Sequence, residues 1–131
     1  MSQEDVQTLQ KAYDAFNRGD IPAVMEAMHA EIRWTEPGGG RAPGGTFNGP
    51  DSVANDVFAI VPENFEQFRA DAEEWIDAAD RLAVAGHFHG STKSGEPVDV
   101  PFVHLWTMRD GKAAGFQNVV DHSLWTQAWG G

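Results

Sequence analysis

The chain has 131 residues, no cysteine, and nine basic against twenty acidic residues, which gives a formal net charge of −11. This length fits one domain, residues 1–131. The negative charge disfavours nucleic acid and anionic membranes as partners. The absence of cysteine excludes disulfides and thiolate metal ligands. No stretch approaches the roughly 20 apolar residues of a membrane span, and the N-terminal MSQEDVQTLQ lacks the features of a secretion signal, so we expect a cytoplasmic protein.

The first two segments have the pattern of a helical hairpin. Residues 4–17 carry one apolar face at helical spacing, made of Val6, Leu9, Tyr13 and Phe16. Gly19 suits the left-handed position that follows a helix. Asp20 can then cap a second helix that runs to about Met28.

The next segment alternates as a strand does. Ile32, Trp34 and Glu36 share one face, while the residues between them take the other. Residues 37–50 are rich in glycine and proline and predict a loop, either a flexible surface loop or a mobile flap beside a pocket. The sequence that follows predicts a third helix, from Asp51 to about Pro62.

The second half of the chain is predicted to be mostly strand. Four segments, 68–76, 82–89, 98–108 and 113–122, have strand character, and the last two are joined by RDGK, a tight-turn signal. Helices followed by a meander of antiparallel strands predict an α+β domain, in which a curved sheet wraps over helices.

Four polar residues stand at positions that face the predicted core. His104 lies between Phe102 and Trp106 at period two, and Asn118 alternates in the same way with apolar neighbours. Tyr13 belongs to the apolar helix face, and Glu36 shares a strand face with a tryptophan. This spacing fits a small-ligand cavity and a hydrogen-bonded polar core equally well.

Two further histidines raise the question of a metal. His87 and His89 share one face of a strand, and His104 lies on a neighbouring strand, as a three-histidine site would require. The alternate residues of the first strand are apolar, however, and burying them turns both histidines outward. We therefore expect no metal, and an outer sheet face that is available to a second subunit.

Three segments in order carry a family resemblance: AYDAFNRGDIPAVMEAMHAEIRWTEPGG, FNGPDSV and PVDVPFVHLWTMRDGKAAGFQNVVD. Together they resemble a SnoaL-like polyketide cyclase domain of the ketosteroid-isomerase superfamily, over about Val6 to Asp121. The resemblance implies a cone with an apolar pocket, in which a strongly bent antiparallel sheet wraps around three helices of the N-terminal half. It also implies a homodimer formed through the outer sheet face.

The resemblance implies roles for particular residues. Tyr13 matches the oxyanion-hole tyrosine of the steroid isomerase, and Glu36, directly before a proline, matches its general-base aspartate. The second oxyanion donor of that enzyme is a protonated aspartic acid, whose place falls on Val103 or His104. In the polyketide cyclases a strand histidine matches His104, and the key aspartate falls on Asn118, whose amide cannot act as an acid or base.

The first hypothesis is therefore an enzyme that needs no cofactor. Glu36 would be the base, with Tyr13 and His104 as donors, in the enolisation of a small apolar or amphipathic carbonyl compound. The ligand would contact Trp34, Phe16, Phe58, Phe102, Trp106, Phe116, Asn118 and Val120. The alternative is a non-catalytic binding or accessory domain that uses the same pocket. A scaffold for subunit contacts alone is disfavoured, because it needs few inward polar groups.

Overall fold

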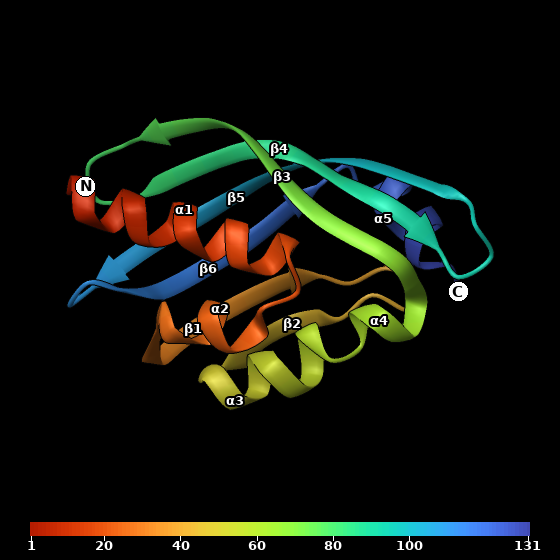
Figure 1. Ribbon diagram of the computed structural model, residues 1–131, viewed down its shortest axis with the longest axis horizontal. Helices are drawn as coiled ribbons and strands as arrows, with labels where there is room; N and C mark the ends of the chain where they lie inside the picture. The colour runs from red at the N-terminus through yellow and green to blue at the C-terminus, as the bar shows by residue number, and fades with distance from the viewer.

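The computed structural model describes residues 1–131 as a mixed α+β fold built on one curved, open six-stranded sheet (Figure 1). The helical elements are α1 (Gln3–Asn17), α2 (Ile21–Glu26), α3 (Pro50–Val53), the π-helical turn η1 (Ala54–Phe58), α4 (Val61–Asn64) and α5 (His122–Trp129). The strands are β1 (Met28–Pro37), β2 (Gly44–Asn48), β3 (Phe65–Asp77), β4 (Leu82–Thr92), β5 (Pro97–Arg109) and β6 (Lys112–Val120). The predicted α+β class, with a bent sheet around helices, is confirmed.

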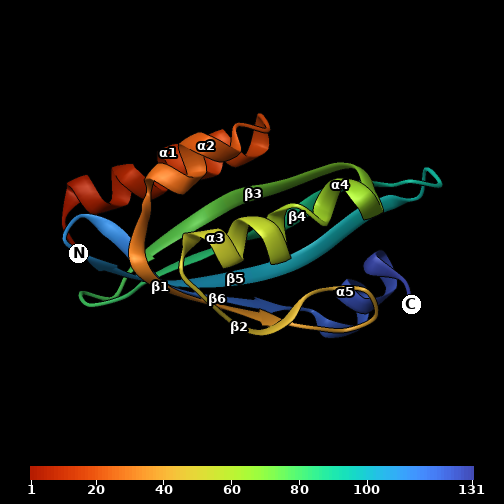
Figure 2. The same cartoon turned by 90° about the horizontal axis from the view of Figure 1, so that it is seen from below.

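The strand order in the sheet is β2-β1-β6-β5-β4-β3. Neighbouring strands run antiparallel, except that β1 and β6 are parallel. Helices α1 and α2 lie along one side of the sheet, and α5 lies at the end opposite the N-terminus (Figures 1 and 2). None of the helices combines the length and the apolar character that crossing a bilayer requires.

Helix α1 is fixed at both ends by polar side chains. The Ser2 hydroxyl accepts a hydrogen bond from the Asp5 amide at 3.0 Å and so caps the N-terminus. At the other end the Asn17 side chain donates to the Ala70 carbonyl at 2.9 Å and accepts from the Ala70 amide at 2.8 Å. This pair of hydrogen bonds to β3 locks the end of α1 to the sheet and so positions Tyr13, one turn earlier, over the inner face.

Three predicted boundaries are corrected by the structure. The segment 37–50 is not all loop, because Gly44–Asn48 pairs with β1 as strand β2. Met28 opens β1 and does not belong to the second helix. The third helix is broken into α3, η1 and α4, and Pro62 lies in the first turn of α4. A proline lacks the amide hydrogen that a helix interior needs, so it is tolerated only in such a first turn.

A C-terminal helix, α5, stands where the sequence predicted the end of a strand at about His122. The Asp121 side chain accepts from the Leu124 amide at 3.1 Å, which caps the helix. Trp125 and Trp129, four residues apart, then lie on one helix face and are both buried. The predicted strand end is wrong because the capping aspartate, and not the alternating pattern of β6, sets the boundary.

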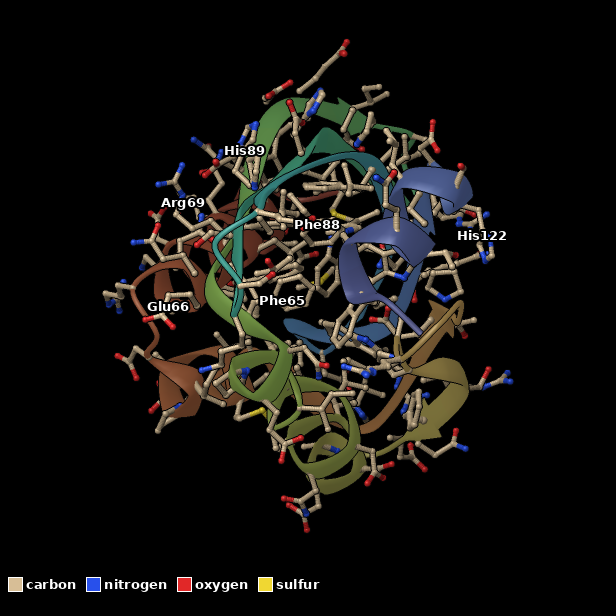
Figure 3. All side chains as sticks on the ribbon, turned by 90° about the vertical axis from the view of Figure 1, so that its right-hand side faces the viewer. Phe65, Glu66, Arg69, Phe88, His89 and His122 are labelled. Carbon is tan, nitrogen blue, oxygen red and sulfur yellow. The ribbon has the colours of Figure 1, made fainter.

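The two faces of β4 divide as predicted. Leu82, Val84 and Phe88 are buried in the single hydrophobic cluster of the fold, whereas His87 and His89 are partly exposed. Figure 3 shows Phe88 projecting into the interior beside α5, with His89 on the opposite side of the strand. The outward direction of the two histidines is therefore confirmed.

We propose that the outer sheet face forms a homodimer interface, since Val103 and Val119 face each other across β5 and β6 with 38% and 43% of their surface exposed. We expect light scattering to give a dimer at micromolar concentration, because pairing this apolar surface removes it from water. Val103→Lys should shift the protein toward monomer, whereas Leu124→Lys, at an exposed apolar residue of α5, should not. A parent protein that scatters as a monomer would contradict the proposal.

Candidate functional site

Three neighbouring strands, β1, β6 and β5, place two rows of side chains on the inner face of the sheet. The parallel pairing sets Trp34 beside Phe116, and the antiparallel pairing sets Phe116 opposite Trp106 and Asn118 opposite His104. The Trp34 and Phe116 rings stack with centroids 3.8 Å apart. One row is thus aromatic, and the row beside it consists of Glu36, Asn118 and His104.

These rows line a cavity of about 80 Å³ between the sheet, α1, η1 and α5. Of the predicted site residues, nine lie in its wall: Tyr13, Phe16, Trp34, Glu36, Phe58, His104, Trp106, Phe116 and Asn118. The wall also contains seven valine and aromatic side chains that the sequence did not indicate as site residues, namely Val24, Val57, Val61, Phe68, Phe88, Trp125 and Trp129. Their helical or strand spacing marked some of them as core, but nothing in the sequence indicated that they meet around a cavity.

Two predicted ligand contacts, Phe102 and Val120, do not line the cavity. Phe102 is buried, and its ring stacks on the His104 ring with centroids 3.9 Å apart and an angle of 7° between the planes. It therefore supports the histidine from the side. Val120 is Phe102's partner in the β5–β6 register and is partly buried against the core.

Glu36 is a buried carboxylate that interacts only with uncharged donors. Its side chain is held at both oxygens: Oε1 accepts from Asn118 Nδ2 at 3.1 Å, and Oε2 accepts from Trp34 Nε1 at 2.6 Å. The residue is 7% exposed, and no lysine or arginine lines the cavity. Burial raises the pKa of Glu36 to about 7, and the hydrogen bonds from Asn118 and Trp34 offset part of that rise. The group therefore changes charge near neutral pH, where a general base is most useful.

Tyr13 and His104 form a hydrogen-bonded pair whose direction can be assigned. Trp106 Nε1 donates to the Tyr13 oxygen at 2.9 Å, and the Tyr13 oxygen lies 2.6 Å from His104 Nδ1. Burial lowers the pKa of His104 to about 3, against an opposing contribution from Asn118, so the ring is neutral at physiological pH. Burial also raises the pKa of Tyr13.

An indole is only a donor, so the Tyr13 oxygen is the acceptor in its bond with Trp106. If His104 Nδ1 also donated to that oxygen, the buried Tyr13 hydroxyl hydrogen would have no acceptor, so we infer that Tyr13 donates to His104 Nδ1. The ring hydrogen of His104 therefore sits on Nε2. The family resemblance implies that Tyr13 donates directly to an oxyanion, yet its hydrogen is already engaged. The available donor is His104, on the inner face, whereas Val103 faces outward.

Four buried polar atoms from residues of the cavity wall have no hydrogen-bond partner: His104 Nε2, Asn118 Oδ1, Trp125 Nε1 and Trp129 Nε1. Asn118 lies close enough to oppose the fall in the pKa of His104, but His104 Nε2 and Asn118 Oδ1 form no hydrogen bond with each other. Buried polar groups are usually paired in folded proteins, so these four atoms are free to bind water or the polar groups of a ligand. No set of three side chains suited to a metal lines this cavity.

The glycine-rich loop between β1 and β2, residues 38–43, is packed against α5. The Arg41 amide donates to the Gly130 carbonyl at 2.8 Å. A Cβ atom on Gly40, whose φ is +58°, would lie 2.0 Å from that carbonyl oxygen, so only glycine allows this approach. Pro43 of the same loop lies in the cavity wall. The loop and α5 together close one end of the cavity, and Glu36 lies within strand β1, not in the loop.

Comparisons with known proteins agree with this fold. The family model for the SnoaL-like domain matches residues 9–116. A nuclear transport factor 2-like protein of unknown function from Burkholderia pseudomallei is 30% identical, with 100% of each chain covered and a TM-score of 0.89. TerC, co-crystallised with polyporic acid, is 27% identical over 96% of this chain and 98% of its own, with a TM-score of 0.86.

A protein with a ketosteroid isomerase-like fold from Catenulispora acidiphila, in complex with trimethylamine, is 17% identical over 86% of this chain and 83% of its own, with a TM-score of 0.73. That likeness concerns the fold alone. No curated protein matches the chain.

The raised pKa of Glu36 predicts a particular dependence of stability on pH. The folded state keeps a proton that the unfolded chain releases between the ordinary glutamate pKa of 4.5 and about 7. The contribution of Glu36 to stability should therefore fall as pH rises through that window and level off above it. The lowered pKa of His104 contributes in the opposite direction below about pH 6.5, and the comparison with Glu36→Gln removes this contribution because both proteins keep His104. Glu36→Gln cannot ionise, so relative to the parent it should gain stability between about pH 5 and about pH 8, by on the order of 2–3 kcal/mol.

Urea unfolding at the two pH values measures this difference. Glu66→Gln is the matched control, because this glutamate is exposed and points away from the interior (Figure 3). If the parent and Glu36→Gln have parallel profiles, the carboxylate is not buried in the way described.

Proposed function

The chain belongs to the SnoaL-like domain family, and we propose that it is a cofactor-independent isomerase or cyclase in which Glu36 acts as general base on a small carbonyl compound. One observation carries this proposal. Glu36 is a buried carboxylate with a pKa of about 7 and no cation in its cavity, and it lies in the same row as a neutral His104 with an unpaired ring hydrogen. A base and a donor in one apolar cavity are the two groups that enolisation requires.

In the proposed reaction the Glu36 carboxylate removes a proton from the carbon next to the substrate carbonyl. The electron pair of that C–H bond moves to form an enolate, and the negative oxygen is stabilised by the hydrogen on His104 Nε2. For isomerisation, protonated Glu36 returns its proton to a different carbon. For aldol cyclisation, the enolate carbon attacks a second carbonyl of the same molecule, and Glu36 gives its proton to the resulting alkoxide.

The neighbouring residues keep the base and the donor in working order. Asn118 and Trp34 hold the Glu36 oxygens in place. Tyr13 occupies His104 Nδ1 and so keeps the ring hydrogen on Nε2, where a substrate oxygen can accept it. A neutral imidazole is a suitable donor here, because it can donate a hydrogen bond to the developing oxyanion without transferring its proton to Glu36.

The cavity also limits the substrate. Its volume of about 80 Å³ is below the roughly 150 Å³ of a cavity that accepts a benzene molecule. Even a substrate with one ring can therefore enter only if side chains of the cavity wall move. The wall is largely aromatic, and the unpaired indole N–H groups of Trp125 and Trp129 can donate to a ligand oxygen. These features favour a compact apolar or aromatic compound that carries a carbonyl and at least one further oxygen. The co-crystal of TerC with polyporic acid supports testing aromatic ligands.

The second candidate is a binding or accessory domain without catalysis, and one observation favours it. Both oxygens of Glu36 and the hydrogen of Tyr13 are already bonded within the protein. In that case the unpaired atoms of the wall would orient a ligand and Glu36 would remain an internal acceptor. Turnover, not binding, separates the two candidates.

Glu36→Gln keeps the size of the side chain but removes the base, so turnover should fall by about 10²–10⁴-fold. Parent turnover, measured on a panel of enolisable ketones and diketones, should rise with pH through about 7 as Glu36 ionises. Binding of the same compounds, followed by indole fluorescence, should persist in the variant. Glu66→Gln should match the parent. Equal turnover in Glu36→Gln would refute the base assignment, and a parent that binds ligand but turns over no compound would favour the binding domain.

Tyr13→Phe tests the hydrogen-bonded pair. The change leaves His104 Nδ1 and Trp106 Nε1 buried without a partner, which should cost about 1–3 kcal/mol of stability. Because His104 can still donate, turnover should fall less than in Glu36→Gln. Nitrogen NMR of the His104 ring should find the hydrogen on Nε2 in the parent and a mixture of tautomers in Tyr13→Phe. A hydrogen on Nδ1 in the parent would show that the assignment is wrong.

A further inference from the structure

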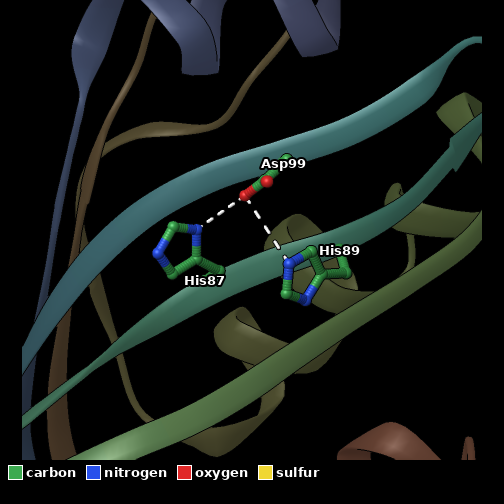
Figure 4. Close-up of side chains that lie close together, drawn as sticks. All are labelled: His87, His89 and Asp99. Carbon is green, nitrogen blue, oxygen red and sulfur yellow. Dashed lines mark hydrogen bonds and ion pairs between the residues drawn. The ribbon is translucent and has the colours of Figure 1, made fainter.

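A second cluster of polar side chains lies on the outer face of the sheet, on the side away from the cavity. His87 and His89 project from β4, and Asp99 projects from β5 beside them (Figure 4). Asp99 Oδ1 lies 2.6 Å from His87 Nδ1 and 3.6 Å from His89 Nε2. The two imidazole rings are nearly parallel, with centroids 5.6 Å apart. One carboxylate oxygen is therefore shared between two imidazoles.

This spacing is close to the one that a metal ion imposes. Zinc binds imidazole nitrogen and carboxylate oxygen at about 2.0–2.2 Å, so the ligand atoms of a tetrahedral site are ~3.3 Å apart. The three ligand atoms here all lie within 4.8 Å of one another. Bringing them to a common centre requires the side chains to rotate and the hydrogen bond between His87 and Asp99 to give up its proton, as metal ligands must be deprotonated.

A further carboxylate orients one of the histidines. Asp71 Oδ2 on β3 lies 2.7 Å from His89 Nδ1, and Arg69 donates to the same oxygen at 2.9 Å. A carboxylate paired with an arginine remains an acceptor, so the hydrogen of His89 sits on Nδ1. The lone pair of His89 is then on Nε2, the atom nearer to Asp99. Histidines that bind metals are usually held by such a carboxylate on the other ring nitrogen.

The charge around the cluster also favours a cation. Asp71 and Asp99 contribute two carboxylates, and Glu73 interacts electrostatically with His87. Arg69 forms an ion pair with Asp71. Both histidine side chains are about a third exposed or more, at 35% and 38%, so a bound ion can keep water as its remaining ligand. Two imidazoles and a carboxylate favour Zn²⁺, Ni²⁺ or Cu²⁺ over Mg²⁺ or Ca²⁺, which prefer oxygen ligands.

We propose that His87, His89 and Asp99 form a binding site for a divalent transition-metal ion, with Asp71 as the residue that orients His89. The sequence suggested only a site that included His104, and the outward turn of the other two histidines argued against it. His104 is indeed buried on the inner face. The third ligand is Asp99, which the register of β4 and β5 places directly opposite His89.

The test is a Zn²⁺ titration of the full chain by calorimetry, after treatment with a chelator and dialysis. We expect one Zn²⁺ per chain and no heat with Mg²⁺. His87→Ala, His89→Ala and Asp99→Asn should each weaken binding by at least about tenfold, and Asp71→Asn by about 10–100-fold through the orientation of His89. Co²⁺ should give the visible absorption of a site with nitrogen ligands, and this absorption should be lost in His89→Ala.

The matched controls are His29→Ala and His122→Ala, because these two histidines lie outside the cluster. Both should bind Zn²⁺ like the parent, and circular dichroism without metal should show that every variant is folded. A parent that does not bind Zn²⁺, or a His87→Ala/His89→Ala double variant that binds it as the parent does, would overturn the proposal. The cavity and its chemistry are not involved, so the enzyme proposal can fail or succeed independently.

Discussion

The site depends on a carboxylate held in an aromatic cavity without a positive charge beside it. A buried carboxylate is tolerated when its oxygens are hydrogen-bonded, and Glu36 meets this condition with an indole from its own strand and an amide from β6. Neutral donors hold the group in place without stabilising its charge as strongly as an arginine would. The result is a carboxylate that is well positioned and also titrates near neutrality.

The same lack of charged partners explains the histidine. Within the cavity wall His104 faces one phenol, one amide and several rings, and none of these groups carries a charge. Its low pKa keeps it neutral, and the bond from Tyr13 selects which nitrogen carries the hydrogen. In the proposed reaction, Tyr13, which resembles an oxyanion donor in sequence, therefore acts through its neighbour His104. The Asn17 side chain, which bonds the end of α1 to β3, positions the phenol that makes this selection.

The two faces of the sheet carry two different clusters of polar side chains. On β5, His104 points into the cavity, whereas Asp99, five residues earlier, lies on the outer face beside two imidazoles. The inner face excludes water and shifts pKa values through burial. On the outer face the histidines form hydrogen bonds with partly exposed carboxylates, and such contacts contribute little to stability by themselves. Their geometry is therefore more informative about ligands than about the fold.

Sequence alone determined which residues face inward, because an alternation of period two depends only on burying the apolar set. That rule placed Glu36, His104 and Asn118 inside and His87 and His89 outside, and the structure agrees. It could not show which strands are neighbours. The parallel pairing of β1 with β6, which brings Glu36 to Asn118, joins residues 82 positions apart.

Only the tertiary structure decided the rest. The capped helix α5 with its two wall tryptophans, the direction of the Tyr13 bond and the approach of Asp99 to the outer histidines all depend on contacts between distant segments. Local patterns carry no information about such contacts, because they reflect the preferences of a single element, whereas a site is formed where several elements meet.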